Sequence, residues 1–274
     1  MATTTQRVMP GFSLCLGYSV TYLSVLVLIP LAACFLKASS LSFQEFWAVV
    51  WTDRARAAYA LTFGAALIAS LINAVLGLNV AWVLARYEFP GKRLVDAFID
   101  LPFALPTAVA GLVFSSLYVP GGWIGQFLAP LGIEAAYSRL GIVLVLTFTS
   151  FPFVVRTVQP VLESLDADVE EAAAILGATR WQTFTRVLLP TILPALLTGV
   201  ALAFARSVGE YGSVVFISGN MPFKTEIAPV LIVARLEEFA YREATAIAIV
   251  LLGISFAVLV AINLLERWSR RHAG

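Results

Sequence analysis

The sequence predicts an all-α membrane protein, and two features of its composition and one of its patterning lead to that fold class. Hydrophobic residues make up 60% of the 274 residues and charged residues only 13%, whereas soluble globular domains carry about 25% charged residues. The apolar residues gather in runs of about 20 or more, the length that crosses about 30 Å of hydrocarbon as a helix. Basic and acidic residues nearly balance, at 18 and 17, so net charge gives no indication of a nucleic-acid partner.

The apolar runs predict a bundle of about six spanning helices in one transmembrane domain that takes in residues 1–274. We expect the core of the bundle over about residues 58–265, because the polar connections between these runs are short. The lipid bilayer is therefore the expected solvent of the chain, which crosses it several times. The predicted spans are Ser13–Leu36, Ala58–Leu84, Ala97–Val119, Leu140–Leu162, Thr191–Ile217 and Ala244–Leu265.

The first span has an alternative interpretation. Arg7, the apolar run and Leu31–Cys34 together are similar to a bacterial lipoprotein signal with its lipid-accepting cysteine. The run is longer than the roughly 7–15 apolar residues of a signal core, and further spans follow it. An uncleaved first helix is therefore favoured.

Two prolines set the third span apart. Pro102 and Pro106 free backbone carbonyls and should bend this helix. Such a break survives in a membrane only where neighbours or a wet cavity satisfy the freed groups, so a kinked helix and a pathway-lining helix both remain open. Glycines inside spans, such as Gly77, Gly111 and Gly253, are expected to permit close helix contact.

Loop charges favour an orientation with both termini in the cytoplasm. The most compact basic clusters, at residues 86–93 and 267–271, fall on the same side of the predicted bundle as the N-terminus. Cytoplasmic loops carry the excess of Lys and Arg, and an even number of spans returns the chain to the side on which it starts.

Hydrolytic and metal chemistry find no support in the residues. Cys15 and Cys34 lie at opposite ends of one predicted span, too far apart for a disulfide. The single histidine, His272, lies in a basic tail and has no metal-ligand spacing around it. We therefore expect no catalytic residue, metal ion or resident cofactor in this chain.

The predicted loop Glu163–Pro190 is too long and too patterned to be a simple connection. Asp166 or Asp168 is expected to cap a first helix, with Glu170 and Glu171 in its first turn, and Gly177 suits a left-handed C-terminal end. Thr179 with Gln182 has the spacing of a capping box for a second helix that Pro190 ends. The physics alone leaves two interpretations open, a helix pair on lipid headgroups and a helix pair that docks on another protein.

A family resemblance favours docking. Glu171-Ala172-Ala173, then Gly177 after three residues and Val187-Leu188-Leu189-Pro190 after nine more, resemble the EAA loop of the membrane permeases of bacterial ABC importers, with Val187 in place of isoleucine. The resemblance implies a type I ABC-importer bundle with a cytoplasmic coupling-helix loop that inserts into an ATP-hydrolysing subunit. It assigns the coupling role to Glu170, Glu171, Ala172, Ala173, Gly177, Leu189 and Pro190.

That ATPase is expected to be a separate subunit. The only Gly-Lys pair, Gly91-Lys92, is followed by Arg93, so the sequence holds no G-x-x-x-x-G-K-[ST] phosphate-binding loop. ATP and Mg are then expected in the partner, and the chain itself is expected to be a transport subunit, not an enzyme. Binding and hydrolysis would bias a two-state bundle between inward-facing and outward-facing forms.

Charged side chains inside the fifth predicted span are candidates for the translocation pathway or gate. Arg206 and Glu210 are spaced four residues apart and can lie on one helix face, and charge inside a bilayer usually pairs or lines a cavity. A structural or gating role is favoured over direct substrate binding, because a paired arginine offers less to an anion. The candidate set is Arg206, Glu210, Tyr211, Pro102 and Pro106.

The segments Ser207–Asn220 and Leu101–Leu112 are similar to those of sulfate/thiosulfate permeases of the T-component type. The resemblance covers most of the chain after about residue 60 and implies two ATPase subunits, a related second permease chain and a periplasmic sulfate-binding protein. Molybdate or tungstate permeases, which would pair with a second copy of themselves, are the alternative. A secondary transporter without an ATPase is a further alternative, although it predicts coupling carboxylates or an inverted repeat at mid-membrane, and Glu210 is the only acid there.

Overall fold

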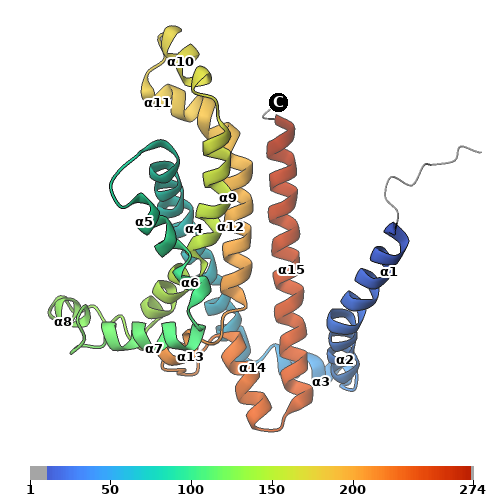
Figure 1. Ribbon diagram of the computed structural model, residues 1–274. Coiled ribbons are helices and arrows are strands. Elements are labelled where there is room, and N and C mark those ends of the chain that lie inside the picture. The colour runs from blue at the N-terminus through green and yellow to red at the C-terminus, as the bar shows by residue number, and fades with distance from the viewer. Residues whose placement is uncertain (1–10, 273–274) are drawn as a thin grey trace, which may run out of the picture.

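The structure is a computed structural model that describes residues 11–272, and side chains within residues 11–264 except that of Ala167 (Figure 1). All regular structure in the described part is helical, which confirms the predicted fold class. Arg7 lies outside the described residues, and so do the side chains of the basic tail, including that of His272.

Five helices in the described residues have the length and apolar composition to cross a membrane. Four of them match predicted spans closely, namely the first, second, fourth and sixth. The first, Phe12–Ala38, consists of three consecutive helical segments. The bounds of these helices are α1 Phe12–Leu23, the π-helical η1 Ser24–Leu28, α2 Ile29–Ala38, α4 Asp53–Arg86, α9 Arg139–Ser164, α12 Leu189–Val208 and α15 Tyr241–His272.

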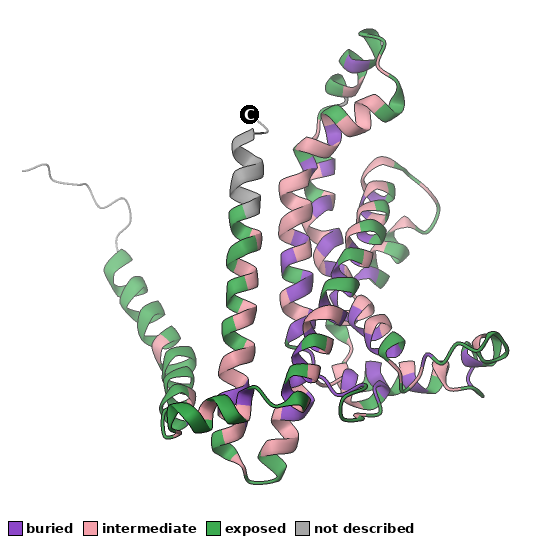
Figure 2. Ribbon diagram, turned by 180° about the vertical axis from the view of Figure 1, so that it is seen from behind, coloured by how far each residue is buried: buried purple, intermediate pink, exposed green. Residues whose placement is uncertain are grey.

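The core of the molecule is the three-helix packing of α4, α9 and α12, which lie against one another along much of their length. Small residues on α4 and α12 allow this approach: a Cβ atom on Gly77 would lie 2.8 Å from Cγ1 of Val154, and one on Gly199 would lie 2.9 Å from Cα of Val154. In Figure 2 the buried residues gather on these helices, whereas α1 is exposed along its length. Close packing through small residues replaces the hydrophobic drive that lipid cannot supply.

The prediction of a single third span at Ala97–Val119 is wrong. The chain forms three short helices instead, α5 Lys92–Ile99, α6 Leu101–Ala104 and α7 Thr107–Tyr118, and the last of these runs across the others in Figure 1. Leu105 and Pro106 both have extended backbone, with ψ of 132°. Proline lacks the N–H for a helical bond and forces the residue before it out of the α region, so Pro106 breaks the helix where a bend was expected. Pro102 lies in the first turn of α6, a position that tolerates proline.

The predicted fifth span, Thr191–Ile217, also ends early. Helix α12 stops at Val208, Gly209 follows as its cap, and a separate helix, α13 Val214–Ile217, begins after a turn. Tyr211 therefore lies in a connecting turn and not on the helix.

The expectation that glycines permit close helix contact holds for Gly111 but not for Gly253 within this chain. Gly111 lies in a close contact, whereas a Cβ on Gly253 would meet nothing within 4 Å.

The remaining helices lie at the two ends of the bundle. Helix α3 Phe43–Val50 packs against α15 and α4, and α14 Ala228–Glu237 packs against α15 and α4. The 163–190 loop lies at the opposite end, and the C-terminal end of α15 lies at that same end in Figure 1. The short elements are α8 Gly125–Leu128, the 3₁₀ helix η2 Ala129–Leu131, α10 Ala167–Ile175, α11 Arg180–Thr183 and the π-helical η3 Phe184–Leu188.

Candidate functional sites in the 163–190 loop and at the end of α12

The first helix of the 163–190 loop forms largely as its sequence predicts. Asp166 occupies the N-cap position of α10, although its side chain makes no capping hydrogen bond. Asp168 and Glu170 lie in the first turn, whereas Glu171 lies just beyond it. Carboxylates near a helix N-terminus are stabilised by the helix dipole, so this acidic start favours the helix.

Gly177 ends α10 in the predicted left-handed conformation, with φ of 78°. The backbone N–H of Ala178 donates to the carbonyl of Ala173 at 3.0 Å, and that of Gly177 donates to Ala174 at 3.0 Å. This bonding pattern satisfies the last carbonyls of the helix. A Cβ on Gly177 would meet no atom within 4 Å, so the glycine is needed for its backbone angle and not for space.

The second half of the loop confirms the capping box but not the helix end. The Thr179 hydroxyl accepts from the N–H of Gln182 at 3.3 Å, and the Gln182 side chain accepts from the N–H of Thr179 at 2.8 Å. The helix does not stop at Pro190, because α11, η3 and α12 continue from Arg180 to Val208. The wide π turn of η3 precedes Pro190 and accommodates a residue that lacks an N–H. The loop is therefore continuous with the helix of the fifth span.

Glu170 and Glu171 face different surroundings. Glu170 forms an ion pair with Arg86 at the end of α4, with 2.5 Å between carboxylate and guanidinium. The Arg86 guanidinium also lies 5.8 Å from the centroid of the Trp82 ring, and Trp82 makes an edge-to-face contact with Phe184 of η3. Glu171 is exposed. The loop is thus attached to α4 by one glutamate and presents the other to solvent.

The outer surface of the loop is apolar as well as acidic. Ile175, Leu176 and Trp181 are 85%, 87% and 72% exposed. Exposed apolar groups that gather on one loop mark an interaction surface. The other candidate coupling residues differ in exposure: Ala172 is exposed, Ala173 is buried, and Leu189 and Pro190 are half-buried at the start of α12.

The second candidate site is the turn that follows α12. Arg206 and Glu210 form the ion pair that their spacing predicts. The side chain of Glu210 is only 2% exposed, that of Arg206 is 32% exposed, and Oε1 of Glu210 accepts from the N–H and hydroxyl of Ser213 at 2.9 and 2.8 Å. Both carboxylate oxygens are therefore engaged, which a buried charge requires.

The turn packs closely against the start of α7. A Cβ on Gly111 would lie 2.8 Å from Cα of Ser213, and a Cβ on Gly212 would lie 3.2 Å from Cβ of Thr107. Pro106 is the N-cap residue of α7, so the structure brings this candidate residue close to the Glu210 turn. Pro102 lies apart from it in α6, a helix that packs against α9.

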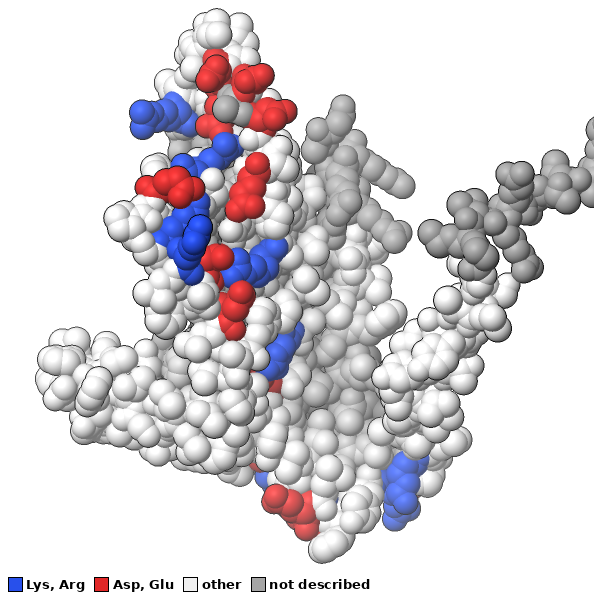
Figure 3. All heavy atoms as spheres, viewed as in Figure 1, with Lys and Arg blue, Asp and Glu red and all other residues white. Residues whose placement is uncertain are grey.

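A cluster of one arginine and two aspartates, toward the end of the molecule that carries the 163–190 loop, was missed in the sequence. The guanidinium of Arg156 on α9 donates to Asp100 at 2.9 and 2.7 Å and to the carboxylate of Asp96 at 2.6 Å. These contacts attach the broken third span to the core. Asp100 inside an apolar run was the signal, because an acid at such a position needs a partner. Figure 3 shows charged side chains gathered at this end of the molecule, with a mostly uncharged surface over α7 and α8.

The chain resembles known transport proteins in sequence. Residues 74–272 match the family described as the binding-protein-dependent transport system inner membrane component. The Sulfate transport system permease protein CysT of Synechocystis sp. is 53% identical over 93% of this chain and 90% of its own. The proteins of that name from Salmonella typhimurium and Escherichia coli are 51% and 50% identical, over 100% of this chain and 99% of their own.

The fold resembles that of a solved importer. The crystal structure of a bacterial ABC transporter involved in the import of the acidic polysaccharide alginate aligns with a TM-score of 0.76 and 15% identity, covering 93% of this chain and 94% of that one. The alginate transporter in complex with an alginate pentasaccharide-bound periplasmic protein aligns with a TM-score of 0.75, 18% identity and 93% coverage of both chains. The family match and the identities of 50–53% show that the chain belongs to the binding-protein-dependent transport system inner membrane components, the membrane permeases of ABC importers.

Proposed function

We propose that this chain is the permease subunit of an ATP-driven importer that carries sulfate or thiosulfate across the cytoplasmic membrane. The observation that carries the proposal is the identity of 50–53% with sulfate permeases over at least 93% of the chain. A hydrolysing partner supplies the energy and holds ATP and Mg, since this chain lacks a phosphate-binding loop.

The 163–190 loop is the proposed contact with the ATPase. Glu171, Ile175, Leu176 and Trp181 offer an exposed surface that combines a carboxylate with apolar groups, a combination that suits an arginine and an apolar cleft on another protein. Two connections lead from this surface into the bundle, namely the Glu170–Arg86 ion pair and the continuous helix from Arg180 to Val208. A movement of the loop would therefore shift both α4 and α12.

The proposed assembly contains two ATPase subunits, a second, related permease chain and a periplasmic sulfate-binding protein. The similar alginate transporter, crystallised with a periplasmic protein, supports the last of these partners. Both termini are proposed to face the cytoplasm. The C-terminal end of α15 lies at the same end of the bundle as the 163–190 loop, the proposed ATPase contact, and this supports the orientation (Figure 1). Reporter fusions after Gly274 and within residues 133–136 should give cytoplasmic and periplasmic readings, respectively.

Arg206 and Glu210 are proposed either to stabilise the helices around the translocation pathway or to gate it. Both oxygens of Glu210 are engaged inside the protein, so this carboxylate has little capacity left for a ligand. Tyr211 and Pro106 lie in the same region and would move with it, whereas Pro102 would act through the α5–α6 segment.

The coupling proposal is tested by Glu171→Lys. Reversing this exposed charge should abolish most sulfate uptake and weaken retention of the ATPase during purification, while the amount of chain in the membrane stays unchanged. Glu134→Lys, an equal reversal at an exposed position between η2 and α9, should retain the ATPase. Normal uptake and normal ATPase retention in Glu171→Lys would contradict the proposed docking surface.

The substrate is tested by labelled uptake in cells that lack this chain. We expect sulfate uptake to fall and molybdate uptake to remain. A loss confined to molybdate would replace the proposed substrate with the alternative oxyanion. Uptake that continues after deletion of the ATPase would instead support an ATP-independent secondary transporter.

A further inference from the structure

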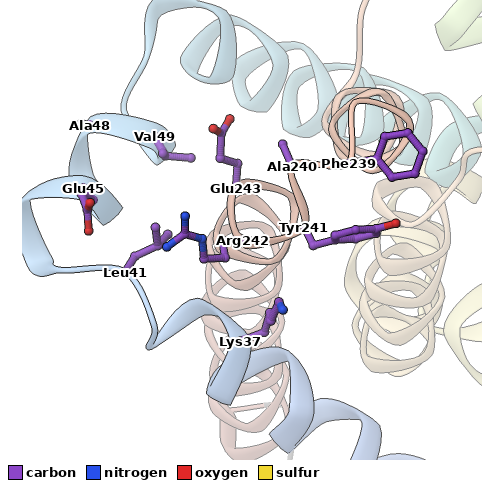
Figure 4. A pocket seen from close by; sticks show the side chains of 10 residues that line it. All are labelled: Lys37, Leu41, Glu45, Ala48, Val49, Phe239, Ala240, Tyr241, Arg242 and Glu243. Carbon is purple, nitrogen blue, oxygen red and sulfur yellow. The ribbon is translucent and has the colours of Figure 1, made fainter.

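A cavity of about 440 Å³ lies at the end of the bundle opposite the 163–190 loop. It is bounded by the end of α2, by α3 and by the start of α15, and Figure 4 shows its lining side chains. Its size falls within the range of about 300–1,000 Å³ that is usual for small-molecule sites. It is separate from the Glu210 turn and from the 163–190 loop, and the proposed transport function leaves it unused.

Two cations line this cavity without an ion-pair partner among the described residues. Lys37 comes from the last turn of α2 and Arg242 from the first turn of α15. Arg242 lies close enough to Glu45 to stabilise its negative charge, but neither cation belongs to an ion pair within 4.0 Å among the described residues. Both side chains can therefore bind an anion that comes from outside the chain.

Two carboxylates also line the cavity, Glu45 from α3 and Glu243 from the first turn of α15, next to Arg242. One oxygen of Glu45 accepts from the backbone N–H of Ser42 at 2.8 Å in a capping box, and this backbone bond, with the Ser42 side chain, lowers the pKa of Glu45 below its ordinary value. Glu243 lies 3.6 Å from Arg235. The cavity thus offers positive and negative groups within one space (Figure 4).

Helix α3 places the cavity at the level of lipid headgroups. Phe43, Trp47 and Trp51 recur every four residues along it and are 77%, 46% and 56% exposed. They stack edge to face along one side of the segment. Exposed tryptophans on a short helix at the end of a spanning bundle are typical of the membrane–water interface.

We propose that this cavity binds the headgroup of a zwitterionic phospholipid of the ethanolamine type. Lys37 and Arg242 bind its phosphate, Glu45 and Glu243 bind its ammonium group, and the acyl chains extend from the cavity into the surrounding lipid. A free phosphate or sulfate ion would pair with the two cations but would leave both carboxylates close to an added anion. A lipid with both charges satisfies all four side chains.

The test measures lipid retention on the full-length chain by native mass spectrometry. The probes are ethanolamine, choline and glycerol phospholipids with identical acyl chains, together with inorganic phosphate and sulfate. We expect the wild-type chain to retain the ethanolamine lipid in preference to the other two. The double variant Lys37→Gln/Arg242→Gln should bind it at least about tenfold more weakly, since charge-assisted bonds to phosphate are lost.

Two further variants separate the site from general effects. Arg56→Gln removes a cation near the same end of the bundle that is paired with Asp53 and should leave retention unchanged. Glu45→Gln keeps a capping-box residue but removes the charge, so the preference for ethanolamine over glycerol headgroups should narrow. Because this change preserves the helix cap, it tests the site even if the double variant fails to fold.

Three results would overturn the proposal. Equal retention of all three lipids by the wild-type chain would remove the headgroup preference. Unchanged retention in the double variant would remove the assigned cations. Displacement of the lipid by millimolar phosphate or sulfate would identify an inorganic anion site in place of a lipid site.

Discussion

Two turns of the molecule, the α10–α11 turn at Gly177 and the turn after α12 at Gly212, use glycine for opposite reasons. Gly177 has φ of 78° and open space around a would-be Cβ. Gly212 has no left-handed backbone angle, yet a Cβ there would meet Thr107 of α7. The first glycine supplies a backbone conformation, and the second supplies room for another helix.

The glutamates near these turns differ in the same way. Glu171 is exposed beside an apolar surface, whereas the side chain of Glu210 is only 2% exposed and is bound on both oxygens. The 163–190 loop therefore suits contact with another protein, whereas the turn around Glu210 packs helices of the same chain together. Substitutions in the 163–190 loop should reduce coupling with little loss of stability, and substitutions around Glu210 should reduce stability first.

The largest effect is expected for Gly111→Ala, which tests the close packing of α7 on the turn. The added methyl would collide with the backbone of Ser213, and a backbone atom cannot move away by changing rotamer as a side chain can. Overpacking of this kind costs about 1–3 kcal/mol or more, so the apparent melting temperature in detergent and the yield from membranes should both fall. Scanning fluorimetry measures the first quantity.

The control for this variant is Gly64→Ala. Gly64 lies within α4, and its Cβ would meet nothing within 4 Å in the chain. Alanine has a higher helix propensity than glycine, so the melting temperature should remain or rise. Equal losses in both variants would show that α7 does not depend on this contact.

A smaller loss is expected for Arg206→Met, which removes the partner of a buried carboxylate. Breaking a fully buried ion pair costs about 3–5 kcal/mol, but Arg206 is 32% exposed and Ser213 still donates twice to Glu210. The expected loss is therefore only about 1 kcal/mol. The double variant Arg206→Met/Glu210→Gln has no unpaired charge and should recover much of the lost stability. A double-mutant cycle on melting temperatures measures the coupling.

Uptake by the same double variant separates the two roles left open for the pair. A stable double variant that still transports sulfate would assign the pair to structure alone. A stable double variant without uptake, or with uncoupled ATP hydrolysis, would assign it to gating. No recovery of stability would contradict the ion-pair account.

The 163–190 loop could be predicted because its determinants are local. The glycine angle at Gly177 and the Thr179–Gln182 capping box are encoded within a few residues, and both appear as expected. The error at Pro190 has a local cause too, since a π turn just before the proline keeps the helix continuous. That turn leaves no simple mark in the hydrophobic pattern.

The region around Glu210 could be predicted only in part, because its structure depends on distant segments. The Arg206–Glu210 spacing gave the ion pair correctly. Three other contacts depend on which helices pack together: the bond of Ser213 to Glu210, the close approach of Gly111 and the ion pair of Asp100 with Arg156. Hydropathy alone places α5, α6 and α7 in one span, and only tertiary contacts reveal where the chain turns.

The smallest effect on the bundle is expected for Gly177→Ala, which tests the 163–190 loop. A left-handed backbone costs a non-glycine residue about 1–2 kcal/mol, and this cost falls on the end of α10 and not on the core. Uptake should fall several-fold while the melting temperature stays within experimental error. Gly132→Ala carries the same backbone cost, with φ of 71° and nothing within 4 Å of the new methyl, but lies beside α8 and should leave ATPase retention unchanged. If both variants reduced ATPase retention equally, the loss would follow from general strain, and the distinction between an exposed contact surface and a structural turn would fail.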